Sequence, residues 1–179
     1  MIRIKVEKAH GDYDYGTSKF FGCPTCPEEW LEDGTVGEND FFFCQLSARE
    51  YAPYDKDGLL PPKGFIYIFL SDDENGGYIP NVRYFDGEPE TLIDDFNAGF
   101  DFLGDTDAEY SIDYEGFGSS DESALLADCS GETVTLLKYD PLDDGMPPFL
   151  SETEKQAFFR INKTDLKALD FSKVEFTIE

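Results

Sequence analysis

Two runs of aromatic and β-branched residues stand out in the pattern of apolar and polar positions. Residues 41–46 read FFFCQL, residues 64–70 read GFIYIFL, and turn-forming residues bound both runs. A short, uninterrupted apolar run of this kind is typical of a strand that is covered on both faces. We therefore predict that these two strands form the central pair of the core. Neither run contains a catalytic signature.

Alternating apolar and polar residues predict further strands. Ile2, Ile4 and Val6 share one face of an extended segment at residues 2–8, which is the pattern of a half-buried strand. Similar patterns predict strands at residues 82–85, 112–117, 133–139, 157–161 and 174–178. Residues 9–40 are rich in Gly and Pro and are predicted to form a long irregular loop.

Helices are predicted to be few and short. Ser47 and Glu50 have the spacing of a capping box, in which each side chain bonds the backbone of the other residue, so a short helix should begin there. Three more short helices are predicted at residues 91–96, 120–128 (with Ser120 as a candidate cap) and 164–169.

These elements together predict an α+β fold with mostly antiparallel sheets and short helices. The strand, loop and strand at residues 43–70 recur in outline at residues 136–161, which suggests an internal duplication. A chain of 179 residues is about the length of one domain. We expect a single domain over residues 1–179, with pseudo-repeat halves at about 1–110 and 111–179.

The charge limits the classes of partner. The chain has 14 basic and 39 acidic residues and a net charge of −25. Nucleic acids and anionic membranes are poor partners for such a protein, because binding to them needs clustered Lys and Arg. A basic protein, a cation or a neutral ligand is compatible. Solubility alone is the simpler explanation of the charge.

The N-terminal residues alternate instead of forming an apolar signal, and no window of 18 or more residues is apolar throughout. We therefore expect a cytoplasmic protein. Its four cysteines should stay as thiols there, since four cysteines in a chain of this length do not make a disulfide framework.

Five segments carry a resemblance to a known family. They are residues 18–24 (SKFFGCP), 43–46 (FCQL), 60–69 (LPPKGFIYIF), 82–85 (VRYF) and 158–174 (FFRINKTDLKALDFSKV). In their order and spacing they resemble the bacterial YwqG-like family, a domain of unknown function. The resemblance covers most of the chain.

Two positions depart from the pattern of this family. Phe21 stands where the family usually has a second glycine, and residues 137–139 read LKY where the family has a more apolar strand with a glutamine. The resemblance implies no established activity. Some members of the family look like genomic neighbours of bacterial toxin systems, which implies an immunity-like role. The acidity of the chain is consistent with neutralisation of a basic toxin.

Trp30, Gln45 and Tyr67 are the candidate binding residues. Aromatic faces with one amide group between them can form a cleft for a small ligand. The simpler interpretation is packing: Trp30 would fix the long loop on the sheet, while Gln45 and Tyr67 would belong to the two core strands.

Cys23 and Cys26 form a C-x-x-C pair, whose spacing allows two thiolates to hold one zinc ion. A closed site would also need Cys44, Cys129 or His10. A lone C-x-x-C pair is a weak signal, and we expect no metal and no cofactor.

No set of residues has the sequence pattern of a known type of catalytic site. His10 is the single histidine and has no evident partner, and phosphate-binding glycine motifs and EF-hand loops are absent from the sequence. We expect an interaction protein rather than an enzyme. The alternatives that stay open are a small-ligand binder or cryptic enzyme with an aromatic cleft, and a purely structural domain.

Overall fold

Antiparallel strands dominate the computed structural model, which describes residues 1–8, 16–36, 40–73, 76–93, 109–116, 121–147, 149 and 154–179. Ten strands form one sheet in the order β12-β11-β10-β9-β1-β8-β2-β4-β5-β6, and β3 pairs with β7 in a second, small sheet. The strands are β1 (Ile2–Lys8), β2 (Lys19–Phe20), β3 (Cys26–Pro27), β4 (Phe41–Ser47), β5 (Phe65–Asp72), β6 (Tyr78–Phe85), β7 (Leu92–Ile93), β8 (Tyr110–Gly116), β9 (Ala124–Leu125), β10 (Thr133–Tyr139), β11 (Ala157–Asn162) and β12 (Glu175–Ile178).

Helices are a minor component. The α-helices of the described residues are α1 (Glu29–Glu32), α2 (Ala48–Tyr51) and α3 (Lys163–Lys167), and the 3-10 turns are η1 (Ala52–Tyr54), η2 (Pro89–Thr91) and η4 (Phe171–Lys173). Within this part of the chain, no helix has the length and apolarity needed to cross a membrane.

The predicted α+β class is therefore wrong. The chain is β-rich, and its large sheet is nearly closed and barrel-like. The short helices lie at strand ends and form no layer of their own, so the sheet must cover its own apolar face by curling. The sheet runs across both predicted halves, since β1 pairs with β8 and β9, and the expected duplication stays a prediction.

The two end strands of the sheet approach each other. β6 lies against β12 and η4, and aromatic rings join them: Tyr78 with Phe176 and Tyr84 with Phe171, both at 6.0 Å between ring centroids. Neither strand pairs with the other among the described residues. Side-chain packing thus takes the place of backbone hydrogen bonds where the sheet would close.

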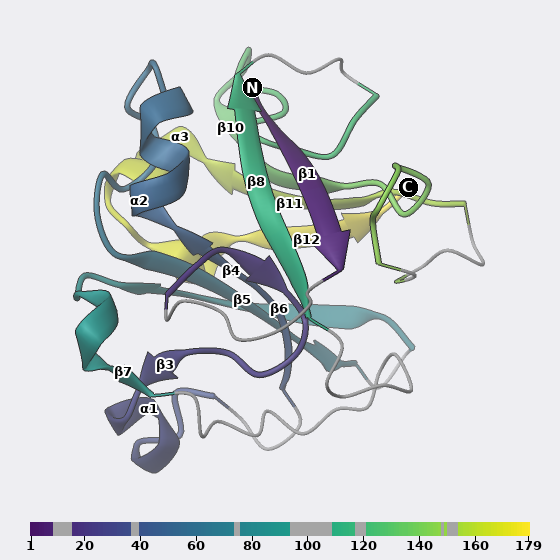
Figure 1. Cartoon of the computed structure of the whole chain (residues 1–179). Helices are drawn as coiled ribbons and strands as arrows, with labels where there is room; N and C mark the ends of the chain where they lie inside the picture. Colours follow the sequence, from purple (N-terminus) through teal and green to yellow (C-terminus); the bar gives the residue numbers. More distant parts are fainter. Residues whose placement is uncertain are drawn as a thin grey trace.

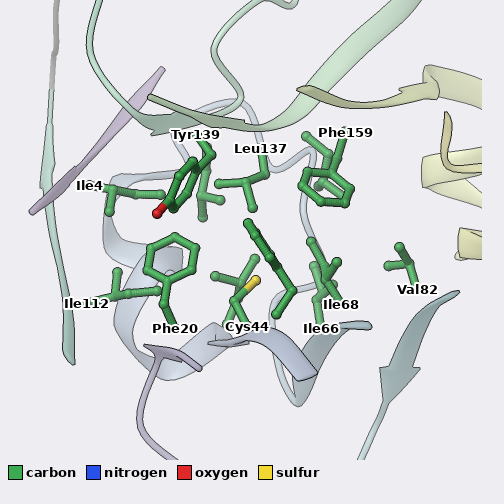
Figure 2. Packing of buried hydrophobic residues seen from close by; sticks show 14 of the residues in the cluster. Ile4, Phe20, Cys44, Ile66, Ile68, Val82, Ile112, Leu137, Tyr139 and Phe159 are labelled. Atoms are coloured by element: carbon green, nitrogen blue, oxygen red, sulfur yellow. The ribbon is translucent and has the colours of Figure 1, made fainter. Parts of the chain in front are cut away.

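Aromatic rings fill the interior of the sheet. Phe43 is fully buried, and its ring centroid lies 5.2–5.6 Å from the rings of Phe20, Phe21, Tyr139, Phe149 and Phe159. Figure 2 shows the surrounding side chains pointing toward one another from strands on opposite sides of the interior. Aromatic rings thus supply the buried apolar surface that leucine-rich amphipathic helices supply in other folds.

The strands β4 and β5 are buried on their outer face as well. Phe42, Phe65, Tyr67 and Phe69 form a second apolar cluster there with Trp30 and others. The segments that cover this face include α1, β3 and β7, which lie together on one side of β4–β6 in Figure 1. Burial on both faces confirms the interpretation of residues 41–46 and 64–70 as a core pair, and these strands pair antiparallel.

The other predicted strands are confirmed where the structure describes them; Phe117 lies outside the described residues. The helix predicted at residues 164–169 is confirmed as α3. The loop predicted at residues 9–40 is only partly irregular, since its described residues contain β2, β3 and α1, and Trp30 lies in α1.

Two predicted helices are wrong. The segment predicted as a helix at residues 120–128 contains β9, where Leu125 pairs with Ile2 on one side and Leu137 on the other. Ser120, its candidate cap, lies outside the described residues. Of the helix predicted at 91–96, Thr91 ends the 3-10 turn η2 and residues 92–93 form β7, while the last three residues lie outside the described part.

Gly64 should be intolerant of a side chain, whereas Gly58 should not. Both have positive φ, +76° and +58°, but a Cβ at Gly64 would overlap the carbonyl oxygen of Phe85, and one at Gly58 would meet nothing within 4 Å. Gly58→Ala should lower the free energy of unfolding by about 1–2 kcal/mol through backbone strain. Gly64→Ala should lower it by a further ~1–3 kcal/mol, because backbone must move. Urea unfolding measures both, and equal losses would contradict the predicted contact.

Candidate functional site

The structure brings Trp30, Gln45 and Tyr67 together on the outer face of β4 and β5. Gln45 lies opposite Tyr67 in the β4–β5 ladder. The ring of Trp30 packs edge-on against Tyr67, with 5.1 Å between centroids. The side chains of Gln45 and Tyr67 are fully buried, and Trp30 is 9% exposed. The predicted grouping is therefore correct in space, although these residues form no open cleft.

Thr25 occupies the centre of this group. The Thr25 N–H donates to Gln45 Oε1 at 2.9 Å, and the Tyr67 hydroxyl donates to the Thr25 carbonyl at 2.6 Å. Gln45 Nε2 donates to the Thr17 carbonyl at 2.6 Å and to Thr25 Oγ1 at 2.9 Å. The polar atoms that a ligand would use already form hydrogen bonds with residues 17–25, the segment that covers them and is called the covering segment below. The geometry thus favours an anchoring role for Gln45 and Tyr67.

A buried ion pair holds the same covering segment at another point. Lys19 Nζ lies 2.6 Å from Glu109 Oε1, and the Cys23 N–H donates to the same oxygen at 3.2 Å. The Lys19 side chain is 8% exposed and that of Glu109 is 21% exposed. Gly22 packs so closely that a Cβ there would overlap the Glu109 side chain. Removing one partner from such a pair leaves a charge buried without compensation.

All four cysteines are free thiols, and Cys23 lies near enough to Cys26 to influence its pKa. Cys26 and Cys44 are buried, while Cys23 and Cys129 are half-buried. No group of three or more His, Cys, Asp or Glu side chains is placed to hold a metal ion in the residues that the structure describes. His10 lies outside them. Burial, and next the neighbouring Cys23, raise the pKa of the Cys26 thiol well above its ordinary value, which disfavours the thiolate that zinc would need.

Glu50 does not close a capping box. Ser47 makes no side-chain cap bond at the start of α2, and Glu50 Oε2 instead accepts from the backbone N–H of Ser18 at 2.7 Å. Ser18 Oγ in turn accepts from Ser47 N and from the Tyr114 hydroxyl, at 2.7 and 2.9 Å. Burial raises the pKa of Glu50, and the bonds from Ser18 oppose that rise. This network fixes the covering segment to α2 and β8.

A cavity of about 200 Å³ lies elsewhere, near the N-terminus marked in Figure 1. Its walls come from the start of β1, the end of β8, the turn that follows η1 and the segment after β9. The lining residues are Met1, Ile2, Tyr54, Asp55, Lys56, Asp57, Gly116, Leu126 and Cys129. We take this cavity, and not the Trp30 cluster, as the candidate site for a ligand, because it is open space lined by polar and aromatic groups.

Asp55 carries the main polar feature of this cavity. Its Oδ2 accepts from the Leu60 N–H at 2.7 Å, whereas its Oδ1 is buried and has no hydrogen-bond partner among the described residues. A buried acceptor without a partner costs about 1–3 kcal/mol. The turn thus leaves one carboxylate oxygen buried and without a partner among the described residues.

Two further features mark the cavity wall. Leu126 has a φ of +51°, a backbone conformation that a bulky side chain rarely adopts. Burial raises the pKa of the Cys129 thiol; Lys163 lowers it, and Asp128 and Asp57 raise it. The thiol is thus uncharged at neutral pH. No sequence pattern pointed to Tyr54. Cys129 was considered only as a possible zinc ligand, and residues 55–57 only as a solvated turn that lacks the spacing of an EF-hand loop.

Gln45→Leu tests whether the Trp30 cluster is structural. The substitution removes the partners of the Thr25 N–H and the Thr17 carbonyl, so the free energy of unfolding should fall by about 2–4 kcal/mol. Tyr67→Phe removes only the bond to the Thr25 carbonyl and should cost about 1 kcal/mol. Urea denaturation compares the two variants. A Gln45→Leu protein as stable as the wild type would show that Gln45 is not an anchor, and would favour a ligand-binding role.

Comparison with protein-family models and with curated proteins found no match. The likeness to the YwqG-like family rests on the five sequence segments alone, and it stays a prediction.

Proposed function

We propose that this chain is a cytoplasmic interaction protein that binds and neutralises a basic protein, in the manner of an immunity protein. The observation that carries the proposal is the net charge of −25 on a single chain of 179 residues. A charge of this size produces a negative potential over much of the surface, which attracts a positively charged partner.

The described basic residues do little to offset this field. Several are already engaged with carboxylates: Lys5 with Glu115, Lys63 with Asp86, and Arg160 with Glu179. Arg3 contacts both Glu115 and Glu122. Exposed acidic residues remain on the paired strands β1 and β8, for example Glu7 and Asp113, and on the end strand β12, for example Glu175. Acidic side chains are therefore exposed on more than one part of the sheet.

Electrostatic attraction has a distinctive kinetic effect. Complementary charge can raise association rates to about 10⁸–10⁹ M⁻¹s⁻¹, from about 10⁵–10⁶ M⁻¹s⁻¹ for uncharged surfaces. Fast capture suits a protein that must neutralise a toxin before it acts. Added salt screens exposed charges, with a Debye length of about 8 Å at physiological ionic strength.

A small-ligand binder is the second candidate. The cavity near Tyr54 and Asp55 favours it, since this space is bounded by several elements and lined by carboxylates and an aromatic ring. The aromatic cleft predicted from Trp30, Gln45 and Tyr67 receives less support, because the Gln45 and Tyr67 side chains bond the chain itself.

Affinity capture from the native host, followed by binding measurements with the purified partner, tests the proposal. We expect a basic protein to bind with an association rate that falls at least about tenfold between about 50 and 300 mM NaCl, because screening weakens the attraction. An unrelated acidic protein of similar net charge is the control, since it should not bind the same partner. Equal binding to this control, or no basic partner at low salt, would contradict the proposal and leave solubility as the explanation of the charge.

A further inference from the structure

We infer that the cavity at Tyr54, Asp55 and Asp57 receives an arginine side chain of the basic partner. This inference rests on the proposed function, and it assigns the central contact of that interface to a particular place. Among the described residues, this cavity combines carboxylates, an aromatic ring and an apolar floor.

The size of the cavity suits a side chain better than a larger ligand. Its volume is about 200 Å³, which corresponds to roughly six or seven water molecules at ~30 Å³ each. Pockets for drug-sized ligands are larger, about 300–1,000 Å³. An occupant that enters from a partner surface needs only to place one long side chain here.

The chemistry of the wall selects a cation that has an apolar stem. Asp55 and Asp57 line the cavity, and Asp57 is an exposed residue. Ile2 and Leu126 line the cavity and can cover the methylene groups, and Tyr54, which is 37% exposed, supplies an aromatic ring that can stack on a flat cation. Hydrogen bonds between a guanidinium group and a carboxylate are among the stronger kinds in proteins.

Positive groups also lie at this site, and they must be accommodated. Lys56 lines the cavity, and the amino group of Met1 is near enough to Cys129 to lower its pKa. Lys56 is an exposed residue, and its methylene stem can cover apolar surface at the wall. Asp128 adds a further carboxylate nearby, and the net charge of −25 favours entry of a cation.

Arginine fits this wall better than lysine does. Its guanidinium group is planar, so it can stack on Tyr54 and present several N–H donors to carboxylates at the same time. A lysine ammonium is a compact and strongly hydrated charge that loses more water on entry. Buried arginines are also enriched among the residues that dominate binding energy at protein interfaces.

The direct test uses a side-chain probe on the full chain. N-acetyl-arginine N-methylamide should bind with a Kd on the order of 1 mM. Binding is measured by NMR titration, and the chemical shifts of Tyr54, Asp57 and Cys129 should change. The matching citrulline compound, which is uncharged and nearly the same shape, should bind at least about tenfold more weakly. Equal binding of the two compounds, or shift changes confined to other residues, would overturn the inference.

Matched variants locate the contact. Asp57→Asn and Tyr54→Ala should each weaken binding of the arginine probe at least about fivefold. Asp144→Asn makes the same charge change next to Gly145, which packs against Val6 near the other end of β1, and it should leave binding unchanged. Unfolding midpoints equal to wild type would show that the variants are folded. Equal losses for Asp57→Asn and Asp144→Asn would mean that overall charge, not the cavity, binds the probe.

Binding measurements with the basic partner distinguish failure of this inference from failure of the proposed function on which it rests. With a purified basic partner, Asp57→Asn should lower affinity at least about tenfold more than Asp144→Asn does. A partner that binds both variants equally and with strong salt dependence would support the proposed function and refute the arginine cavity. A cavity that binds the arginine probe in a chain that binds no basic protein would refute the proposed function instead.

Discussion

The packing of aromatic rings around Phe43 is the constraint on which the rest of this structure depends. Phe20 and Phe21 come from one end of the chain, whereas Tyr139, Phe149 and Phe159 come from the other, and all lie in ring contact with Phe43. Because the helices of the described residues form no layer over the sheet, these rings must supply the buried area that holds its two ends together. The near-closure of the sheet at Tyr78 and Phe176 follows from the same packing.

Filling both faces of β4 and β5 also determines where function can lie. The outer face is covered by a segment that Gln45, Tyr67, Glu50 and Glu109 hold in place through hydrogen bonds. Buried polar groups of this kind are costly unless they are bonded, and here the chain itself supplies the partners. A ligand would have to displace that segment. Among the described residues, the exposed acidic surface and the cavity beside Tyr54 are open to recognition.

Strands were predictable from the sequence because an apolar run or an alternating pattern reflects burial directly, as in residues 41–46 and 133–139. The fold class was not, because closure of a sheet depends on contacts between distant rings. The Ala-Leu-Leu segment at 124–126 has a helical composition, but Ala124 and Leu125 pair with both β1 and β10, and that pairing overrides propensity. The capping box predicted from Ser47 and Glu50 does not form for a similar reason. The Glu50 carboxylate accepts from the backbone N–H of Ser18, which is distant in sequence, and not from Ser47. The cavity joins four remote segments, so no local pattern could indicate it.

The most direct test of this account is the unfolding of Phe43→Ala followed by two probes. Trp30, the single tryptophan, reports on the outer cluster through its fluorescence, and far-UV circular dichroism reports on the sheet. If the ring cluster unites the chain, both probes should show one coincident transition, and both should lose about 3–5 kcal/mol of stability in the variant. A Trp30 transition that separates from the sheet signal, or that is unaffected by Phe43→Ala, would contradict the account.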